Sequence, residues 1–219
     1  MARLASSHRR ARRPDRRRRA ARAEGRDARQ ALLDAAARVF SERGLGGASM
    51  DDVARAAGFS KGALYWHFAG KDELFFALLE ERVDRPLREM IDLLETAPAE
   101  QDMAPEASRR FVELLVTQRD LVLLDQEYWA QAVRDPKLRR RYAARQRALR
   151  EALARALVAR MSHLGGPPFE TPAEGIATAM IALANGLALE KLVDASAVPD
   201  HLLGEVIVLI YRGLVASAA

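Results

Sequence analysis

Residues 49–68 contain two short helix signals separated by a single glycine, and this arrangement constrains the fold more than any other part of the sequence. Ser49 is a good N-cap, and Asp52, three residues later, can complete a capping box. Gly58 stands where the first helix must end with a positive φ, which glycine adopts without strain. Ser60 is a second N-cap, so another helix follows directly. Two short helices joined by a tight glycine turn are typical of a helix-turn-helix motif.

The second helix of the motif, expected over 61–67, is too short to be stable without tertiary support. Leu64 and Phe68 supply one buried edge, and the other edge is polar and aromatic. A helix N-terminus with a lysine suits a phosphate, and small side chains or a tyrosine ring can lie against base edges. The alternative is an ordinary core helix with buried aromatic residues. We favour contact with double-stranded DNA, and the expected DNA-binding residues are Ser49, Lys61, Gly62, Ala63, Tyr65, His67 and Lys71.

Residues 26–86 resemble the DNA-binding domain of the tetracycline-repressor (TetR) family of transcriptional regulators. The resemblance rests on 29–40, on the Ala-Gly-Phe-Ser-Lys-Gly-Ala-Leu-Tyr-Trp-His-Phe run at 57–68, and on Lys-Asp-Glu-Leu at 71–74. It implies a three-helix DNA-binding head over 26–86 with its helix-turn-helix motif at 49–68. It also implies phosphate contacts from Ser49, Lys61, Tyr65, His67 and Lys71, and groove-facing positions from Lys61 to Tyr65.

Two positions depart from the pattern of the family. Ala48 stands where many relatives carry threonine, so a phosphate contact is missing there. Asp51 stands where some relatives carry a basic, base-reading residue. Because DNA repels an acid, Asp51 is not counted as a contact.

The first 25 residues form an arginine-rich arm with almost no apolar side chain. The chain has a formal net charge of +5, but residues 1–26 hold eleven arginines against Asp15 and Glu24, so the remainder is net negative. Such a segment cannot bury enough surface to fold alone, and we expect disorder over 1–25. It is either a solvated extension, or a translation start placed too early, or a basic arm that binds phosphates or the minor groove. A transit peptide is disfavoured because the arm has no apolar helical face.

Composition and motifs argue against an enzyme. The chain has 219 residues and no cysteine, which excludes disulfides and thiol-bound metals. The four histidines occur in no metal-binding or catalytic pattern, and no nucleophile elbow or glycine-rich phosphate loop is present. We therefore expect no catalytic residue, no metal site and no cofactor.

The rest of the chain, 87–219, is helical in period, so the fold class is all-α with a larger helical domain for effector binding and dimerisation after the head. Pro86 should split a helix that covers 71–95 near Arg85. Further helices are expected over 106–119, 121–134, 136–163, 172–194 and 199–216.

The helix expected over 136–163 carries many arginines beside an apolar stripe. A solvated amphipathic helix is the favoured interpretation, and a second nucleic-acid surface is the alternative.

The helices expected over 172–194 and 199–216 are apolar on more than one face, with small residues in the first of them. Such helices must be buried on more than one side. A core within one chain is the simple explanation, but a homodimer that pairs both helices of each subunit accounts better for the excess. Reading DNA with one short helix per subunit also favours a dimer, with half-sites about 34–36 Å apart or a small multiple of that distance.

A set of apolar and aromatic residues falls on helices that should surround a core of the second domain. Family resemblance implies a small-molecule effector pocket there, coupled to the head through the helix that contains Pro86. The expected effector-binding residues are Trp129, with Glu127 and Gln131 as polar anchors. The wider set is Phe111, Leu114, Leu115, Leu124, Tyr128, Trp129, Tyr142 and Met180.

Taken together, the sequence predicts a dimeric transcriptional regulator, most often a repressor in the resembling family, that an effector releases from a palindromic operator. An architectural protein that binds DNA without sequence preference through the arginine-rich arm is the first alternative. A ligand-binding protein with a vestigial motif is the second. No signal peptide opens the chain and no run approaches about eighteen apolar residues, so we expect a cytoplasmic, nucleoid-associated protein without a membrane segment.

Overall fold

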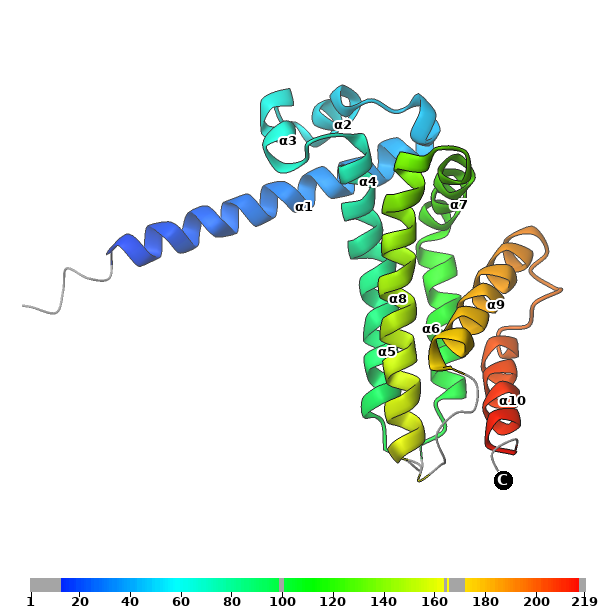
Figure 1. Ribbon diagram of the computed structural model, residues 1–219. Helices are drawn as coiled ribbons and strands as arrows, with labels where there is room; N and C mark the ends of the chain where they lie inside the picture. The colour runs from blue at the N-terminus through cyan, green and yellow to red at the C-terminus, as the bar shows by residue number, and fades with distance from the viewer. Residues whose placement is uncertain (1–12, 99–100, 164, 166–171, 217–219) are drawn as a thin grey trace, which may run out of the picture. The chain divides into compact units, whose positions relative to one another are not determined.

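The computed structural model describes residues 13–98, 101–163, 165 and 172–216, and within these ranges the chain is helical and forms no strand (Figure 1). The all-α fold class is therefore confirmed. The chain divides into two compact units. We call the unit that ends at Leu78 the head and the unit that begins at Leu79 the body. The sequence analysis placed this division at residue 86.

The head consists of α1 (Arg13–Gly47), α2 (Met50–Ala57), α3 (Lys61–His67) and most of α4 (Lys71–Leu79). Gly44 has a φ of 66° and a ψ of 171°, which interrupts the helical backbone near the end of α1. Only glycine adopts this conformation readily, so the chain can turn there toward α2.

The core of the head is built from the apolar faces of all four helices. Phe40 of α1 packs edge-to-face on Phe75 of α4, with ring centroids 6.2 Å apart. Val53 of α2 and Leu64 of α3 are fully buried against them. Phe68 is also buried, and the guanidinium carbon of Arg29 lies 5.3 Å from its ring centroid. The two short helices are therefore held by side-chain burial, which their own length could not supply.

The amino-terminal arm differs from the expected disorder where it is described. Residues 1–12 lie outside the described residues, and from Arg13 the backbone is helical and continuous with α1. Arginine and alanine are strong helix formers, and Pro14 suits the first turn of a helix. Extending a helix that is already anchored costs far less than nucleating a new one, so a segment that cannot fold alone can still extend α1.

A π-helical turn, η1 (Glu80–Asp84), joins α4 to α5 (Arg85–Thr96). The N–H of Arg85 donates to the carbonyl of Glu80, five residues earlier. Pro86 causes this widening, because its ring would clash with the carbonyl four residues before it in a regular helix. The expected interruption of the helix near Arg85 is confirmed.

The body contains five further helices besides α5 within the described residues. In Figure 1, α5 lies alongside α8, and α8 in turn contacts α7 and α9. One apolar cluster joins α5, α8 and α9, and a second joins α6, α9 and α10. The five helices are α6 (Ala104–Thr117), α7 (Arg119–Arg134), α8 (Pro136–His163), α9 (Ala173–Val193) and α10 (Leu202–Ala216).

One helix of the body, α9, is long and apolar enough to cross a membrane by length and composition alone. This differs from the expectation that no segment of the chain reaches that length. Only 22 % of its most apolar stretch is buried in the structure, and an exposed stripe includes Ala179, Ala182 and Gly186. A helix of a soluble protein that packs on more than one side has the same composition.

Candidate nucleic-acid interface and ligand cavity

The entry to α2 is a complete capping box. The backbone N–H of Asp52 donates to Ser49 Oγ at 3.2 Å, and the backbone N–H of Ser49 donates to Asp52 Oδ2 at 3.2 Å. Ser49 Oγ also donates to Asp52 Oδ2 at 2.6 Å, and this hydrogen bond lowers the pKa of Asp52. The exit is Gly58, with a φ of 73° in the left-handed region. The predicted helix-turn-helix geometry is confirmed.

The exposed edge of α3 carries the aromatic side chains of the motif. Ser60 caps the helix by accepting from the N–H of Ala63 at 3.1 Å. Leu64 is fully buried, whereas Tyr65 is 45 % exposed and Trp66 is 78 % exposed. The alternative of an ordinary core helix with buried aromatic residues is therefore wrong.

Trp66 was not among the residues expected from the sequence. It is the more exposed of the two large aromatic side chains on α3, and its ring lies edge-to-face against His67, with centroids 4.6 Å apart. Helical spacing contained the signal, since a residue two positions after buried Leu64 and two before buried Phe68 faces away from the core.

Lys61 opens α3 and is paired with Asp51 of α2. Its Nζ lies 2.9 Å from Asp51 Oδ1, and both side chains are more than half exposed. The hydrogen bond and the charge of Asp51 raise the pKa of Lys61. The ammonium is also 5.9 Å from the ring centroid of Tyr65. Lys61 therefore lies on the exposed edge as expected, but a phosphate must compete with a carboxylate for it.

Lys71, for which a backbone phosphate contact is predicted, donates to two backbone carbonyls of the protein. Its Nζ donates to the carbonyl of Leu45 at 2.5 Å and to the carbonyl of Ala48 at 3.2 Å, and the side chain is partly buried. These carbonyls belong to residues 45–48, the end of α1 after Gly44 and the start of the link to α2, where backbone acceptors lack helical partners. Lys71 therefore holds this segment in place, as Ser49 holds the start of α2.

His67 ends α3 and is partly buried. Burial, together with the positive charge of Arg29, lowers the pKa of His67. Its ring is therefore neutral at neutral pH, with one nitrogen that donates and one that accepts. A Cβ at Gly62 would clash with no neighbour, since Ser60 Oγ would lie 3.9 Å from it.

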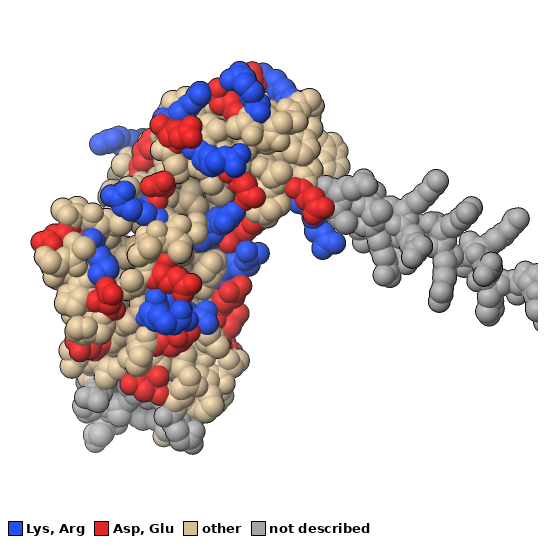
Figure 2. Space-filling view, turned by 180° about the vertical axis from the view of Figure 1, so that it is seen from behind, with Lys and Arg blue, Asp and Glu red and all other residues tan. Residues whose placement is uncertain are grey.

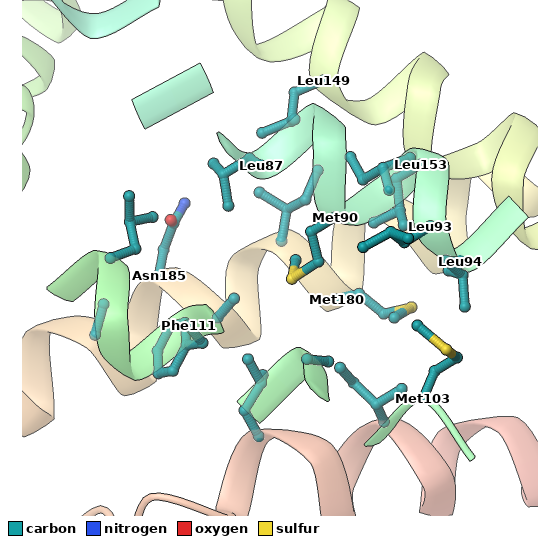
Figure 3. A pocket seen from close by; sticks show the side chains of 18 of the residues that line it. Leu87, Met90, Leu93, Leu94, Met103, Phe111, Leu149, Leu153, Met180 and Asn185 are labelled. Carbon is teal, nitrogen blue, oxygen red and sulfur yellow. The ribbon is translucent and has the colours of Figure 1, made fainter. Parts of the chain in front are cut away.

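The body encloses a cavity of about 610 Å³ that is separate from the predicted DNA-binding residues. The six helices α5 to α10 contribute to it, and half of the lining residues are leucine, isoleucine or methionine. Figure 3 shows Met90, Met103, Met180 and Phe111 around it, with Asn185 as the polar side chain among those labelled. A concave, apolar site with a few polar groups is the usual form of a small-molecule site.

Four residues of the wider set expected around an effector pocket line the cavity. Phe111, Leu114, Leu115 and Met180 line it, whereas Leu124, Tyr128 and Tyr142 pack in the neighbouring core. The three residues expected to bind the effector do not line it, and Trp129 is 51 % exposed.

The reason lies in the register of α7. Asp125 and Gln126 line the cavity, and Trp129 lies on the same stripe one turn further along, where the cavity has ended. Glu127 and Gln131 lie on another face of α7, where Gln131 Nε2 is 3.5 Å from Glu127 Oε1.

A buried ion triad beside the cavity was not expected from the sequence. Arg145 donates through Nε and Nη2 to Asp84 at 2.7 and 2.6 Å, and through Nη1 to Asp125 at 2.9 Å. Burial opposes ionisation of Arg145, but the two carboxylates outweigh it and raise its pKa. Burial raises the pKa of Asp125 and raises that of Tyr142 to about 12. The triad ties η1 to α7 and α8.

Arg160 is a second buried arginine of α8, with 7 % exposure. It donates to the carbonyls of Ala97, Pro98 and Gln101 at 2.6 to 2.8 Å. Arg145 and Arg160 therefore depart from the solvated face expected for this helix, while Arg139, Arg140 and Arg141 are exposed. Arg145 and Arg160 each follow a buried residue, Tyr142 or Leu157, by three positions. Residues three apart share one helix face, so this spacing indicates that both arginines face the core.

The face of the molecule drawn in Figure 2 carries basic and acidic side chains side by side, without an extended region of one sign. The exposed ion pairs of α6 have the same mixed character, since Arg109 contacts both Glu106 and Glu113. In the described part of the chain, no three histidine, aspartate or glutamate side chains gather as a metal site.

A capped helix-turn-helix head followed by a helical body with an apolar cavity defines a class of two-domain helical proteins, and the comparisons with known proteins place the chain within it. Residues 32–78 match the family described as bacterial regulatory proteins, tetR family, and residues 104–207 match the BetI-type transcriptional repressor, C-terminal. The chain belongs to the tetR family.

Individual relatives agree with this assignment. The regulator TtgW of Pseudomonas putida is 47 % identical over 60 residues, which cover 27 % of this chain and 45 % of TtgW. The repressor AcnR of Corynebacterium diphtheriae is 28 % identical over 158 residues, or 72 % of this chain and 77 % of AcnR. The chain thus spans less than half the length of TtgW.

Among solved structures, the multidrug binding protein EbrR in complex with imidazole has a similar fold. It is 27 % identical with a TM-score of 0.59, and the match covers 84 % of this chain and 89 % of EbrR.

Proposed function

We propose that this protein is a homodimeric, sequence-specific DNA-binding transcriptional regulator, and that it is a repressor which a small-molecule effector releases from a palindromic operator. The observation that carries the proposal is the exposed edge of α3, where Tyr65 and Trp66 project from a helix fixed by two caps and a buried Leu64. Aromatic side chains are left in water at a cost unless a partner covers them, and a major groove accepts a helix of this size.

The proposed contacts divide between bases and phosphates. Gly62, Ala63 and Tyr65 face the bases, and His67 binds a phosphate through its N–H. Lys61 reaches a phosphate after leaving Asp51. Ser49 and Lys71 contribute mainly by fixing the segment that leads into α2, through the hydrogen bonds described above.

The proposed dimer pairs α9 and α10 of each subunit. The exposed stripe of α9 carries Ala179, Ala182 and Gly186, which let a partner helix approach closely, and Leu209 of α10 is 65 % exposed. An isologous four-helix contact would cover both surfaces. A two-fold dimer presents two copies of α3, and this explains why the operator should be palindromic.

The proposed effector site is the cavity of the body. EbrR is described as a multidrug binding protein and AcnR as a repressor, and both resemble this chain over most of its length. A ligand that prefers the dimer conformation unfit for DNA must weaken operator binding by the factor by which DNA weakens ligand binding. The protein would act on chromosomal DNA in the cytoplasm.

The experiment that tests this function is selection of bound fragments from a random DNA library with the full chain, beside its Tyr65→Ala variant. We expect the native chain to enrich one palindromic sequence and the variant to enrich none while keeping the native circular dichroism spectrum. Retention of all fragments without enrichment would indicate the architectural alternative. A failure to retain DNA even at low salt would indicate a vestigial motif.

A further inference from the structure

The charged side chains that line the cavity already have partners within the protein, and this restricts the compounds that can bind there. Among the lining residues the ionisable ones are Asp102, Glu106, Asp125, Arg145 and Arg160. A buried ion is tolerated in a protein when its hydrogen bonds and charge are satisfied.

The guanidinium groups of Arg145 and Arg160 already donate hydrogen bonds to acceptors of the protein. All three nitrogens of Arg145 donate to Asp84 and Asp125. Arg160 donates through Nη1 and Nη2 to three backbone carbonyls, which point the negative ends of their dipoles at it. An anionic ligand would therefore gain no new arginine contact unless one of these bonds broke.

The acids are likewise engaged. Glu106 accepts from Arg109 and Arg110 at 2.6 to 2.9 Å, and the hydrogen bonds lower its pKa to about 2. Asp102 accepts from the N–H of Ala104 at 2.9 Å at the start of α6.

Asp102 is exposed to solvent, so the triad, with two carboxyl groups and one guanidinium, is the buried part of the described lining where a cation could be attracted. Asp125 Oδ1 and Oδ2 both lie within 3.0 Å of Arg145 Nη1, and Tyr142 donates to Oδ2 at 3.3 Å. Both oxygens of Asp84 also accept hydrogen bonds from Arg145, so each carboxylate oxygen of the triad is already bonded within the protein. A cation therefore finds no free carboxylate oxygen there.

The remaining polar lining is uncharged. Its amide side chains can each donate to a carbonyl or accept from a hydroxyl. They are Gln101, Gln126, Gln146 and Asn185. The rest of the lining is apolar, including three methionines whose flexible side chains adapt to different shapes.

We propose that the cavity binds an uncharged, predominantly apolar compound with a hydroxyl or carbonyl group, and that it discriminates against organic anions and cations. The assignment of this compound as the effector rests on the proposed function. An ion entering the cavity would lose its hydration without gaining a partner, whereas apolar surface gains about 25 cal/mol for each Å² removed from water.

The experiment uses three compounds with the same ten-carbon chain: decan-1-ol, decanoate and decylammonium. Calorimetric titration of the full chain at pH 7.5 without DNA is expected to show decan-1-ol binding and both ions binding at least about tenfold more weakly, a difference of about 1.4 kcal/mol. Either ion binding as tightly as the alcohol, or none of the three compounds binding, would overturn the proposal.

Two matched variants locate the binding. Leu149 lines the cavity, so Leu149→Trp should fill it and weaken decan-1-ol binding at least about tenfold. Leu123 of α7 is 43 % exposed and lies outside the lining, so Leu123→Trp should leave binding unchanged. Equal effects of both variants would contradict binding in the cavity. Because DNA is absent, these results are independent of whether the head recognises an operator.

Asp125→Asn keeps the side-chain shape and removes the acid from the triad. Decylammonium binding should remain weak in this variant, because the native triad already offers a cation no free carboxylate oxygen. A native protein that binds decylammonium tightly and loses this binding in Asp125→Asn would instead identify the triad as a cation site and refute the proposed selectivity.

Discussion

Lys61 Nζ lies 2.9 Å from Asp51 Oδ1 and 3.1 Å from Oδ2, so the lysine at the start of the recognition helix is paired with an acid of the preceding helix. Both side chains are exposed, at 62 % and 52 %. In the proposed complex with DNA, a phosphate would replace this carboxylate at Lys61. Asp51 would then lower the affinity for DNA of any base sequence.

Asp51→Asn should strengthen binding to DNA of any sequence by about two- to fivefold, the equivalent of an exposed ion pair. The slope of log affinity against log salt should become steeper by up to about one, because one more cation is available to displace counterions. Fluorescence anisotropy with labelled random DNA between 50 and 200 mM salt measures both quantities.

Asp27→Asn is the matched control, since it changes the net charge of the head equally on exposed α1, away from Lys61. If both variants strengthened binding to the same extent, the effect would reflect net charge and the pairing with Lys61 would have no role.

Gly62→Ala should separate stability from DNA binding. A Cβ at this position meets no atom closer than 3.9 Å, and alanine favours the helix by about 0.5–1 kcal/mol over glycine. The head should thus become more stable, while operator affinity should fall about tenfold because the Cβ separates the helix backbone from DNA. Unchanged operator affinity would remove Gly62 from the interface.

Gly58→Ala should make the head less stable, whereas Gly62→Ala should make it more stable. Its φ of 73° strains any residue with a Cβ, so the free energy of unfolding should fall by about 1–2 kcal/mol. Urea denaturation followed by circular dichroism compares the two glycines. A neutral Gly58→Ala would show that the turn does not need the left-handed conformation.

Arg145→Met should destabilise the body by about 3 kcal/mol or more, because two buried carboxyl groups lose the partner that satisfies both. Asp125→Asn in the same background should recover part of this loss, since one buried charge is then removed. Additive losses in the double variant, measured by urea denaturation, would mean that the triad does not act as a unit.

The pH dependence follows from the direction of the shift at Asp125. Its pKa is raised in the folded protein, so the folded state keeps a proton that the unfolded state has released. The free energy of unfolding should therefore decrease as pH rises from about 3.9, the usual pKa of an aspartate, to the raised folded value. Comparing the native protein with Asp125→Asn from about pH 4 upward isolates this contribution from that of His67, whose lowered pKa acts in the opposite direction in both proteins.

Ala182→Arg should convert the proposed dimer into monomers, because a long charged side chain would replace a small one in the middle of the exposed stripe of α9. Ala144→Arg on the exposed side of α8 is the control and should remain dimeric. Sedimentation velocity distinguishes the two states. A dimeric Ala182→Arg protein would place the interface elsewhere.

Local signals in the sequence determined the helix-turn-helix geometry, because the caps at Ser49 and Ser60 and the turn at Gly58 involve contacts within a few residues. The partners of Lys71 could not be predicted, since the carbonyl of Leu45 is 26 residues away and meets it only after folding. The same holds for Arg145, which meets Asp84 across 61 residues.

The extent of the cavity in the body could not be predicted from the sequence. The stripe of α7 that faces it was identifiable from helical period, but the point where the cavity ends along that stripe depends on packing by the other helices. Trp129 therefore lay one turn too far, while the closer Asp125 and Gln126 line the cavity.

The ratio of dissociation constants for the selected operator and for a scrambled sequence of equal length, at one stated salt concentration, tests the central claim most directly. A regulator whose α3 reads base edges should prefer the operator by at least about a thousandfold, and Tyr65→Ala should reduce that ratio toward one. A native ratio near one, with DNA still bound, would contradict sequence-specific recognition by this helix.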